Sequence, residues 1–247
     1  MTQTFIYDSA DLKKDKVAIC GAEAKHMASV LRINPGEVVR LIDGAGKALI
    51  CEVVKIVSKQ VDCRVIKSLK NSGEPSFQLT LACGISSSGK FDLILEKGTE
   101  IGVIRFIPLI TEKGIVRLGG DDAIKTKMQR WQRVILAATK QSGRSVFPDI
   151  TRPLSYSSFI NGISPESALL FHPGRENDNI FNRFKKIDNN RLTVITGSES
   201  GFSNQEIETA VERGIPTVSL GNRILRAETA AVVFSSMAIY FCDSVKA

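Results

Sequence analysis

The sequence predicts an α/β domain built on a parallel sheet and preceded by a small β-barrel. From Phe77 onward, short apolar runs alternate with amphipathic segments, which is the order of strands and helices in an α/β fold. Before position 70, closely spaced runs rich in Val and Ile predict short strands. A polar segment with glycine and proline, 70–75, lies between the two patterns and predicts a linker. We therefore place the domains at residues 1–72 and 73–247.

Each part contains recognisable elements. In the first part, strands are expected at 38–42, 48–56 and 61–66, with a turn at 43–46 and a helix over 23–31. In the second part, strands are expected at 77–83, 103–110, 168–171, 192–196 and 217–220. Helices are expected at 91–101 and 124–138, after Ser203, and from Ala227. Ser203 and Glu206 have the spacing of a capping box.

The charge of the chain favours an anionic partner. The formal net charge is +7, and residues 1–72 contain 12 Lys and Arg against 8 Asp and Glu, whereas the remainder contains 21 against 18. The smaller part is thus the more basic per residue, which suits contact with an RNA backbone. A basic surface that only faces solvent explains the same numbers equally well.

Cysteine and histidine usage limits the possible chemistry. The five cysteines have no C-x-x-C spacing and lie in apolar segments, so we expect reduced, buried thiols. Two histidines offer little material for a metal site or a histidine-based triad, and we expect no metal. The first residues show no signal-peptide pattern and no run is long enough to span a membrane, so a soluble, cytoplasmic protein is expected.

Two glycine-bearing turns near the end of the chain predict a ligand site. One lies at 197–201 and the other begins at Gly221, each directly after an expected strand. Turns at the carboxyl ends of neighbouring strands are where α/β sheets bind ligands. The chain has no G-x-G-x-x-G and no Walker lysine at these turns, so a nucleoside-like ligand held by backbone contacts is expected. The alternatives are an ordinary strand-to-helix turn for the first loop and core packing for the second.

These turns also carry a family resemblance. The runs GSESGFSNQE and SLGNRILRAETA resemble the paired signature of the RsmE family in the SPOUT superfamily of methyltransferases. The segments 26–47, 91–117 and 130–150 are similar to that family in order and spacing, so the resemblance spans almost the whole chain. The chain has Ser198, Ser200 and Ala227 where the family usually has proline, glycine and threonine.

The resemblance implies a specific activity and architecture. Members transfer a methyl group from S-adenosylmethionine to N3 of a uridine in 16S ribosomal RNA of the small ribosomal subunit. It implies a SPOUT-type parallel sheet with a C-terminal trefoil knot, a PUA-like RNA-binding β-barrel before it, and a homodimer. The sequence pattern alone, without the resemblance, argues against a knot, because knotted chains are rare. The apolar loop 223–225 is compatible with one.

Site residues follow from the same resemblance. His172, with Gly174, matches a third cofactor loop, although a lone histidine is often structural. The residues expected to bind the cofactor are Leu170, His172, Gly197, Glu199, Gly201, Leu220, Gly221, Ile224 and Leu225.

Catalytic and RNA-binding candidates are all charged. Uridine N3 must lose its proton before it can accept a methyl group, so a carboxylate and a guanidinium beside the cofactor suit the chemistry, and Arg226 and Glu228 are the candidates. Glu228 would also favour the helix dipole without any catalytic role. Arg144 is expected to bind RNA phosphate or to reach the site of a neighbouring subunit, with a cation beside a glycine helix cap as its alternative. The RNA-binding candidates in the first domain are Arg32, Arg40 and Lys47.

Three other functions remain open at this point. One is a related SPOUT enzyme that methylates a ribose 2′-hydroxyl or a transfer-RNA base. A nucleotide-binding oxidoreductase is disfavoured by the missing fingerprint. A non-catalytic RNA-binding protein is supported by Ser198 and Ser200, which replace the usual proline and glycine of the family signature.

Overall fold

The computed structural model describes residues 2–57, 60–173, 180–187 and 190–244. The chain forms two units, which we describe separately. The first comprises the chain up to Glu74 together with Thr139–Phe147, and the second comprises Pro75–Ala138 and the chain from Pro148 onward. A short segment from the middle of the chain therefore belongs to the N-terminal unit. The expected division into two continuous domains, 1–72 and 73–247, does not include this feature.

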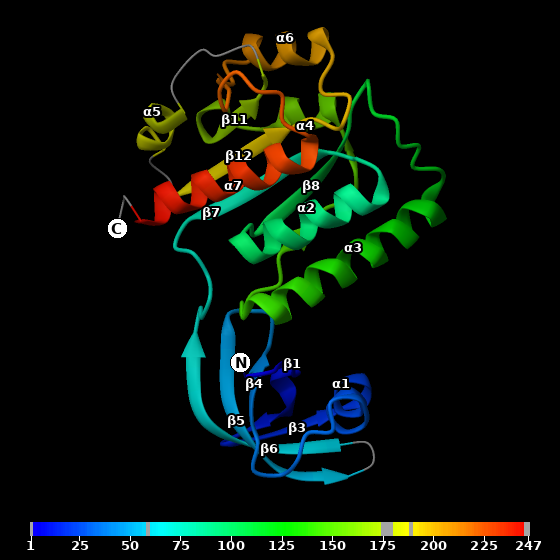
Figure 1. Cartoon of the computed structure of the whole chain (residues 1–247), viewed down its shortest axis with the longest axis vertical. Helices are drawn as coiled ribbons and strands as arrows, with labels where there is room; N and C mark the ends of the chain where they lie inside the picture. Colours follow the sequence, from blue (N-terminus) through cyan, green and yellow to red (C-terminus); the bar gives the residue numbers. More distant parts are fainter. Residues whose placement is uncertain (1, 58–59, 174–179, 188–189, 245–247) are drawn as a thin grey trace. The chain divides into compact units, whose positions relative to one another are not determined.

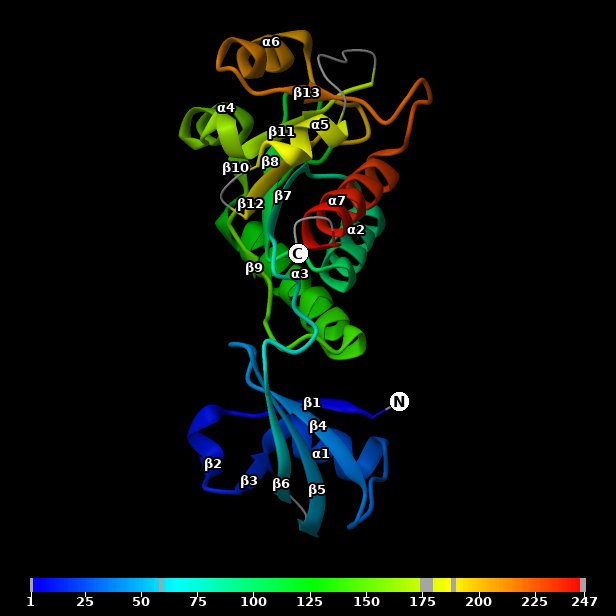
Figure 2. The same cartoon turned by 90° about the vertical axis from the view of Figure 1, so that its left-hand side faces the viewer.

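The first unit is built on a six-stranded sheet in the order β1-β4-β5-β6-β3-β2 (Figures 1 and 2). β1 pairs with β4 in parallel, and the other neighbours are antiparallel. Its core contains the side chains of Phe5, Met27, Leu41, Leu49 and Val61. The elements are β1 (Thr4–Ile6), η1 (Ser9–Asp11), β2 (Leu12–Lys13), β3 (Lys16–Cys20), α1 (Gly21–Lys25), η2 (His26–Val30), β4 (Val38–Ile42), β5 (Lys47–Val57) and β6 (Gln60–Lys70).

The three strands expected in this unit are present as β4, β5 and β6, and the helical segment is present as α1 and η2. The sequence analysis did not predict β1, β2 and β3. β1 and β2 have three and two residues, too few to show an alternation, whereas β3 has five residues and was missed. The boundary between the two units, Glu74 to Pro75, lies within the expected linker at 70–75, and Glu74 is held by hydrogen bonds. The carboxylate of Glu74 accepts the backbone N–H groups of Ser145 (2.7 Å) and Val146 (2.9 Å), and this contact fixes residues 139–147 in the first unit.

The second unit contains a parallel sheet of seven strands, and the prediction of a parallel α/β sheet is confirmed. Its order is β10-β8-β7-β12-β11-β13, with β9 also paired to β8, and every strand pair is parallel. The strands are β7 (Gln78–Gly84), β8 (Arg105–Ile110), β9 (Asp149–Ile150), β10 (Leu154–Ser155), β11 (Ala168–Phe171), β12 (Arg191–Thr196) and β13 (Thr217–Val218). The helices are α2 (Ser88–Ile101), α3 (Asp121–Ser142), α4 (Tyr156–Gly162), η3 (Pro165–Ser167), α5 (Ile180–Lys185), α6 (Asn204–Glu212) and α7 (Ala227–Ser244).

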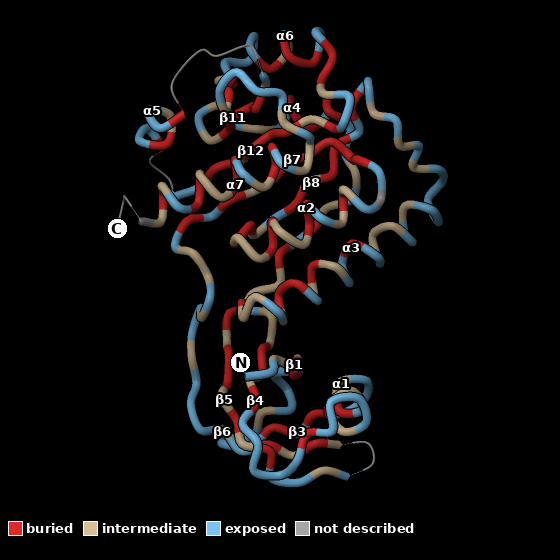
Figure 3. The backbone as a smooth tube through the Cα atoms, viewed as in Figure 1, coloured by how far each residue is buried: buried red, intermediate tan, exposed pale blue. Residues whose placement is uncertain are grey.

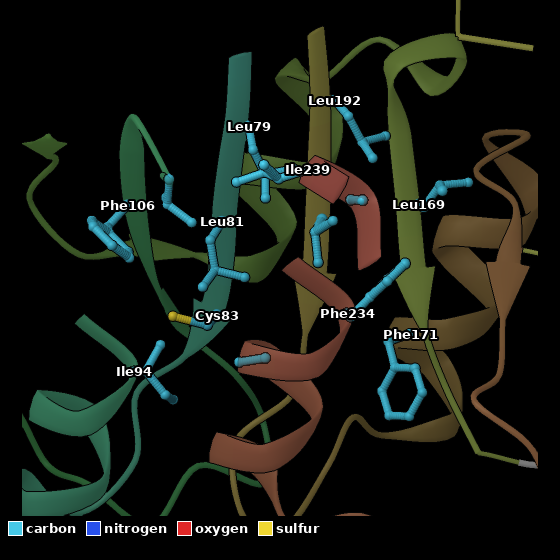
Figure 4. Close-up of a cluster of buried hydrophobic side chains, with 14 of the residues drawn as sticks. Leu79, Leu81, Cys83, Ile94, Phe106, Leu169, Phe171, Leu192, Phe234 and Ile239 are labelled. Carbon is cyan, nitrogen blue, oxygen red and sulfur yellow. The ribbon is translucent and has the colours of Figure 1, made fainter. Parts of the chain in front are cut away.

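Helices cover both faces of this sheet. α2 and α7 lie side by side on one face, and α4 and α6 lie on the other (Figures 1 and 2). Successive residues of a strand point to opposite faces. Leu81 and Cys83 accordingly pack under α2 and α7 with Phe234, whereas Ala82 packs under α4 and α6 (Figure 4). None of the described helices has the length and hydropathy needed to cross a bilayer.

The strand order places three loops at one edge of the sheet. β12, β11 and β13 are neighbours and run parallel, so the segments that follow them begin side by side. β11 is buried along its whole length, and β12 is buried except near its start (Figure 3). The exposed groups of this edge therefore lie mainly in the loops beyond the strands.

Candidate functional site

A cleft of about 310 Å³ lies at the carboxyl edge of the second unit's sheet. Its walls come from the segment after β11, the segment after β12, the start of α7 with the residues before it, and the loop after β8. Six of the expected cofactor residues line it, namely His172, Gly197, Glu199, Gly201, Ile224 and Leu225. The two glycine-bearing loops therefore meet at one site.

The first loop is a tight turn that depends on glycine. Gly201 donates its backbone N–H to the carbonyl oxygen of Ser198 at 2.9 Å and has φ +67°, a conformation that favours glycine. A Cβ on Gly197 would lie 3.0 Å from the Cα of Gly201. A Cβ on Gly84, at the end of β7, would lie 2.3 Å from the backbone nitrogen of Ser198. The turn thus packs directly against β7, and side chains at Gly84 or Gly197 would displace it.

Glu199 connects this turn to the start of α2. Its Oε1 atom accepts hydrogen bonds from the backbone N–H (3.1 Å) and the hydroxyl (2.9 Å) of Ser87, and it lies 3.2 Å from Nζ of Lys90. Partial burial raises the pKa of the Glu199 carboxyl, but the hydrogen bonds from Ser87 and Lys90 outweigh it, and the pKa lies below its usual value. Glu199 is therefore ionised at neutral pH and braces the loop.

Ser198 and Ser200 are the positions at which the first loop departs from the resembled signature. Ser198 is buried, and its Oγ lies 3.5 Å from Oγ1 of Thr111, at the beginning of the loop after β8. Ser200 is exposed and also lines the cleft. The loop retains its tight turn with serine at both positions.

The expected capping box follows this loop and is confirmed. The hydroxyl of Ser203 accepts the backbone N–H of Glu206, and Oε2 of Glu206 accepts the backbone N–H of Ser203. The start of α6 is thereby fixed at the end of the first loop.

The second loop divides into buried and exposed parts. Leu220 and Leu225 pack against the core under α7, as expected of apolar residues. Ile224 is 89% exposed, so core packing, the alternative considered for the second loop, does not apply to this residue. It lines the cleft and forms an apolar wall there. Gly221 has φ +92°, and no atom lies within 3.9 Å of a Cβ built on it, so backbone conformation and not lack of space requires glycine.

Three of the expected cofactor residues do not line the cleft. Leu170 is fully buried and packs under α4 and α6, because its position in β11 points away from α7. Leu220 and Gly221 precede the part of the loop that reaches the cleft. Gly174 lies outside the described residues. The assignment of these three residues to the cofactor stays a prediction.

Arg226 and Glu228 flank Ala227, which lines the cleft. Arg226 is exposed, whereas Glu228 is half-buried in the first turn of α7. Oε2 of Glu228 is buried and accepts no hydrogen bond from the described residues. Such an oxygen is available to a partner that the chain itself does not supply.

Arg144 fits the alternative considered for it, a cation beside a glycine helix cap. Its side chain is 1% exposed, and its Nη2 and Nε atoms lie 2.7 and 3.0 Å from Oε2 of Glu74, which is itself 9% exposed. Gly143 has φ +70°, and Arg144 donates its backbone N–H to the carbonyl oxygen of Thr139, which completes a glycine cap after α3. This buried ion pair makes Arg144 a structural residue of the first unit, and its burial argues against contact with an RNA phosphate.

The other RNA-binding candidates differ in their environments. Arg32 is exposed, and Lys47 is half-buried. Arg40 donates to the carbonyl oxygen of Gly143 at 2.7 Å and also contacts Ser72, and burial lowers its pKa below the usual value. Arg40 is therefore used partly within the first unit, and Arg32 and Lys47 remain the better candidates for phosphate contact.

Lys113 lines the cleft but was not identified from the sequence. It follows β8, which is separated from β11 by two other strands, so its sequence position gives no sign of this proximity. The sequence feature that could have identified Lys113 is its position just beyond the carboxyl end of a parallel strand, where α/β sheets bind ligands.

The thiols are unsuited to chemistry at this site. Four of the five are buried, as expected, whereas Cys20 is exposed, and none forms a disulfide in the described chain. Burial raises the pKa of Cys63 and of Cys83 to about 12, so both are protonated at neutral pH. Among the described residues, no three His, Cys, Asp or Glu side chains are arranged to hold a metal ion.

Comparison with known families places this cleft within a recognised domain. A family described as an RNA methyltransferase domain matches residues 73–239, and an RNA methyltransferase PUA domain matches residues 19–66. Ribosomal RNA small subunit methyltransferase E of Mesomycoplasma hyopneumoniae is 31% identical over 73% of this chain and 77% of its own length. The chain belongs to the RsmE family of RNA methyltransferases.

Further relatives in this family extend over nearly all of the chain. The methyltransferase E of Aquifex aeolicus is 29% identical over 96% of this chain and 99% of its own. The crystal structure of a methyltransferase E from Neisseria gonorrhoeae, bound to S-adenosyl methionine, has a TM-score of 0.83 and 26% identity, and the match covers 96% of each chain. The methyltransferase match contains every described residue that lines the cleft, and the PUA match contains Arg32, Arg40 and Lys47.

Proposed function

We propose that this protein transfers a methyl group from S-adenosylmethionine to N3 of a uridine in 16S ribosomal RNA of the small subunit. The observation that carries the proposal is the meeting of three loops, after β11, after β12 and before α7, in one cleft of an RsmE-family chain. The bound S-adenosyl methionine of the Neisseria gonorrhoeae relative supports the choice of cofactor.

The cleft fits a nucleoside-containing cofactor. Its volume of about 310 Å³ lies at the lower end of the range for small-molecule sites, roughly 300–1,000 Å³. Ile224 and Leu225 would hold the adenine against an apolar wall, while the backbone of 197–201 would contact the polar parts. When bound, S-adenosylmethionine supplies an electrophilic methyl group on a positively charged sulfur.

The residues that flank Ala227 suit the proton chemistry of this reaction. Uridine N3 is a poor nucleophile until its proton is removed. Glu228 has a buried carboxylate oxygen that no described residue engages, and it would accept this proton. Arg226 is exposed beside it and would stabilise the negative charge that then spreads over N3 and the neighbouring carbonyl oxygens.

The first unit would hold the RNA, as a PUA-like barrel. Its PUA match and its basic composition support this role. Arg32 and Lys47 would contact phosphate groups, and such contacts position the RNA without reading its sequence.

We further propose a cytoplasmic homodimer with a C-terminal trefoil knot, as the resemblance to the SPOUT superfamily implies. Val233 and Tyr240 lie two turns apart on α7 and are 38% and 73% exposed, so this helix carries an apolar strip that a second copy would cover. The burial of Leu225 against the core supports the threaded path of its loop. Sedimentation of wild type and Tyr240→Arg tests the dimer.

The decisive experiment uses small subunits from a strain that lacks this gene. Incubation with the protein and methyl-labelled cofactor is expected to label 16S RNA, and mass spectrometry of the nucleosides is expected to show N3-methyluridine. Label on a ribose 2′-hydroxyl or on transfer RNA would favour another SPOUT activity instead. Cofactor binding without any transfer would favour a non-catalytic RNA-binding protein.

A further inference from the structure

Lys113 places a cation at the cleft. It comes from the loop after β8, which is not one of the expected cofactor loops. It is an exposed residue, and it lines the same cleft as Gly197 and Ile224. No ion pair with a described residue engages its ammonium group. By contrast, Lys90, at the other side of the first loop, is paired with Glu199.

The two residues before Lys113 are both tied to the segment that follows β12. Oγ1 of Thr111 lies 3.5 Å from Oγ of Ser198, and the backbone N–H of Glu112 donates to Oε1 of Glu206 at 2.9 Å. These contacts hold the loop after β8 against the first cofactor loop. Lys113 is thereby positioned at the cleft by its own backbone.

Glu206 is the residue on which this arrangement depends. Its Oε1 accepts the N–H of Glu112, while its Oε2 accepts the N–H of Ser203 at 2.7 Å. One buried carboxylate thus joins the loop that carries Lys113 to the loop that carries Glu199. Glu206 is a positioning residue, because it reaches the cleft only through these two backbones.

The charges around the cleft favour an anion beside Lys113. Among the described residues that line the cleft, the other titratable side chains are His172 and Glu199. The Glu199 carboxylate is compensated by Lys90 and Ser87, so it does not neutralise Lys113. A cation held in place before the reaction is most effective where negative charge develops during it.

We propose that Lys113 stabilises the anion that forms on the uracil ring when N3 loses its proton. This inference rests on the proposed function. In the balanced step, the N3–H bond breaks and the proton passes to a base. The N3 electron pair then bonds to the methyl carbon, and the pair of the broken carbon–sulfur bond stays on sulfur. Lys113 donates to a ring carbonyl oxygen next to N3 and makes the deprotonated ring accessible at neutral pH.

Three variants test this role. Lys113→Met removes the charge and keeps the chain length, Lys113→Arg keeps the charge, and Lys125→Met removes the same charge from an exposed position on α3. For each, calorimetry gives the affinity for S-adenosylmethionine, and binding to small subunits at several salt concentrations gives the RNA affinity. Single-turnover methylation is then measured from about pH 6 to about pH 9.

For Lys113→Met we expect both affinities within about twofold of wild type and methylation at least about tenfold slower at neutral pH. The deficit should shrink as the pH rises, because the ring then ionises without help. Lys113→Arg should recover most of the rate, and Lys125→Met should match wild type.

Other outcomes overturn the proposal. A weaker affinity for S-adenosylmethionine would assign Lys113 to the carboxylate of the cofactor, and a weaker, less salt-dependent RNA affinity would assign it to phosphate. A rate equal to wild type, or a deficit that is constant with pH, would also exclude anion stabilisation. Failure of the wild-type protein to methylate would instead overturn the proposed function, so the two failures are distinct.

Discussion

The carboxylate of Glu199 accepts two hydrogen bonds from Ser87, one from the backbone N–H and one from the hydroxyl. Glu199 lies in the turn after β12, and Ser87 immediately precedes α2, so the pair joins segments 112 residues apart in sequence. A carboxylate held in this way is a poor proton acceptor at neutral pH, because its partners favour the charged form. Glu199 therefore orders the cofactor loop and leaves the role of base to another residue.

Loss of the hydrogen bonds between Glu199 and Ser87 should weaken cofactor binding. Glu199→Ala is expected to lower the affinity for S-adenosylmethionine by about tenfold or more, since hydrogen bonds to a charged group are worth about 1.5–3 kcal/mol. Ser87→Ala removes the hydroxyl contact alone and should produce a smaller loss. Calorimetry checks both, and an unchanged affinity in Glu199→Ala would show that the loop needs no brace.

The hydrogen bonds that Glu199 accepts should also be sensitive to acid. The pKa of Glu199 is lower in the folded protein than in the unfolded chain, where a glutamate has a pKa of about 4.3. Its stabilisation is therefore fully present above about pH 4.3 and is lost as the pH falls through the folded value. Cofactor affinity should be insensitive to the titration of Glu199 at neutral pH and fall in more acidic solution. In Glu199→Gln this acid-dependent component should be absent.

Gly221 should be needed for its backbone conformation. At φ +92° a side chain is strained, by about 1–2 kcal/mol or more, although the space around a Cβ is open. We expect Gly221→Val to abolish detectable binding of S-adenosylmethionine while the thermal transition stays cooperative. Gly162→Ala, at the end of α4 and also in open space, is the control and should bind normally. Normal binding by Gly221→Val would show that the second loop tolerates another path.

The basic residues of the first unit should separate into two classes. Arg32→Gln and Lys47→Gln should weaken RNA binding, and each should lower its salt slope by roughly 0.7–0.9 for every phosphate that the side chain neutralises in the wild type. Arg40→Gln should instead lower the melting temperature, because it removes the hydrogen bond to the carbonyl oxygen of Gly143. Lys125→Gln on α3 is the charge-matched control. Equal salt slopes for all variants would place the RNA-binding surface elsewhere.

Arg144 and Glu74 should matter for stability. Removing one member of a buried ion pair leaves an uncompensated charge and typically costs about 3–5 kcal/mol. Arg144→Met and Glu74→Gln should each lower the free energy of unfolding of the first unit by an amount in this range, as measured by denaturant titration. The burial of Arg144 argues against a contact with RNA phosphate. If Arg144→Met is as stable as wild type but binds RNA poorly, Arg144 contacts phosphate after all.

The sequence was sufficient for the parallel sheet because strands buried on both faces leave an apolar run. Ala168–Phe171 and the strand at 192–196 could be recognised in this way. β9 and β10 have two residues each, which is too short for any periodicity to be visible, whereas β13, expected at 217–220, is present at Thr217–Val218. The helix expected from 91 begins at Ser88, and its first residues were missed because the three residues before Phe91 add no apolar residue to the helical pattern.

The candidate site was predicted only where contacts are local in sequence. The turn at 197–201 and its capping box could be read directly, since their geometry depends on neighbouring residues. Lys113 and the pairing of Glu199 with Ser87 depend on strand order, which a single sequence does not reveal. Arg144 shows the opposite error, because a basic residue beside a helix end gives no sign of the buried carboxylate that binds it.

Arg226 and Glu228 should matter for turnover more than for binding. They flank a residue that lines the cleft, and Oε2 of Glu228 is buried without a hydrogen bond from the described residues. An interaction made mainly in the transition state changes the catalytic rate and leaves ground-state binding nearly unchanged. We therefore expect Arg226→Ala and Glu228→Gln to bind cofactor and RNA normally but to methylate at least about tenfold more slowly, within the range for general-base and electrostatic groups.

The measurement of these two variants must first control for assembly, because α7 is also the proposed dimer surface. Sedimentation should show that each variant has the same oligomeric state as wild type, and Thr229→Ala, an exposed neighbour in the same helical turn, serves as the matched control. Single-turnover assays on small subunits then isolate the chemical step from product release. If Glu228→Gln is correctly assembled and methylates at the wild-type rate, Glu228 is not the base. The proton would then pass to water, with Arg226 and Lys113 making the uracil anion accessible.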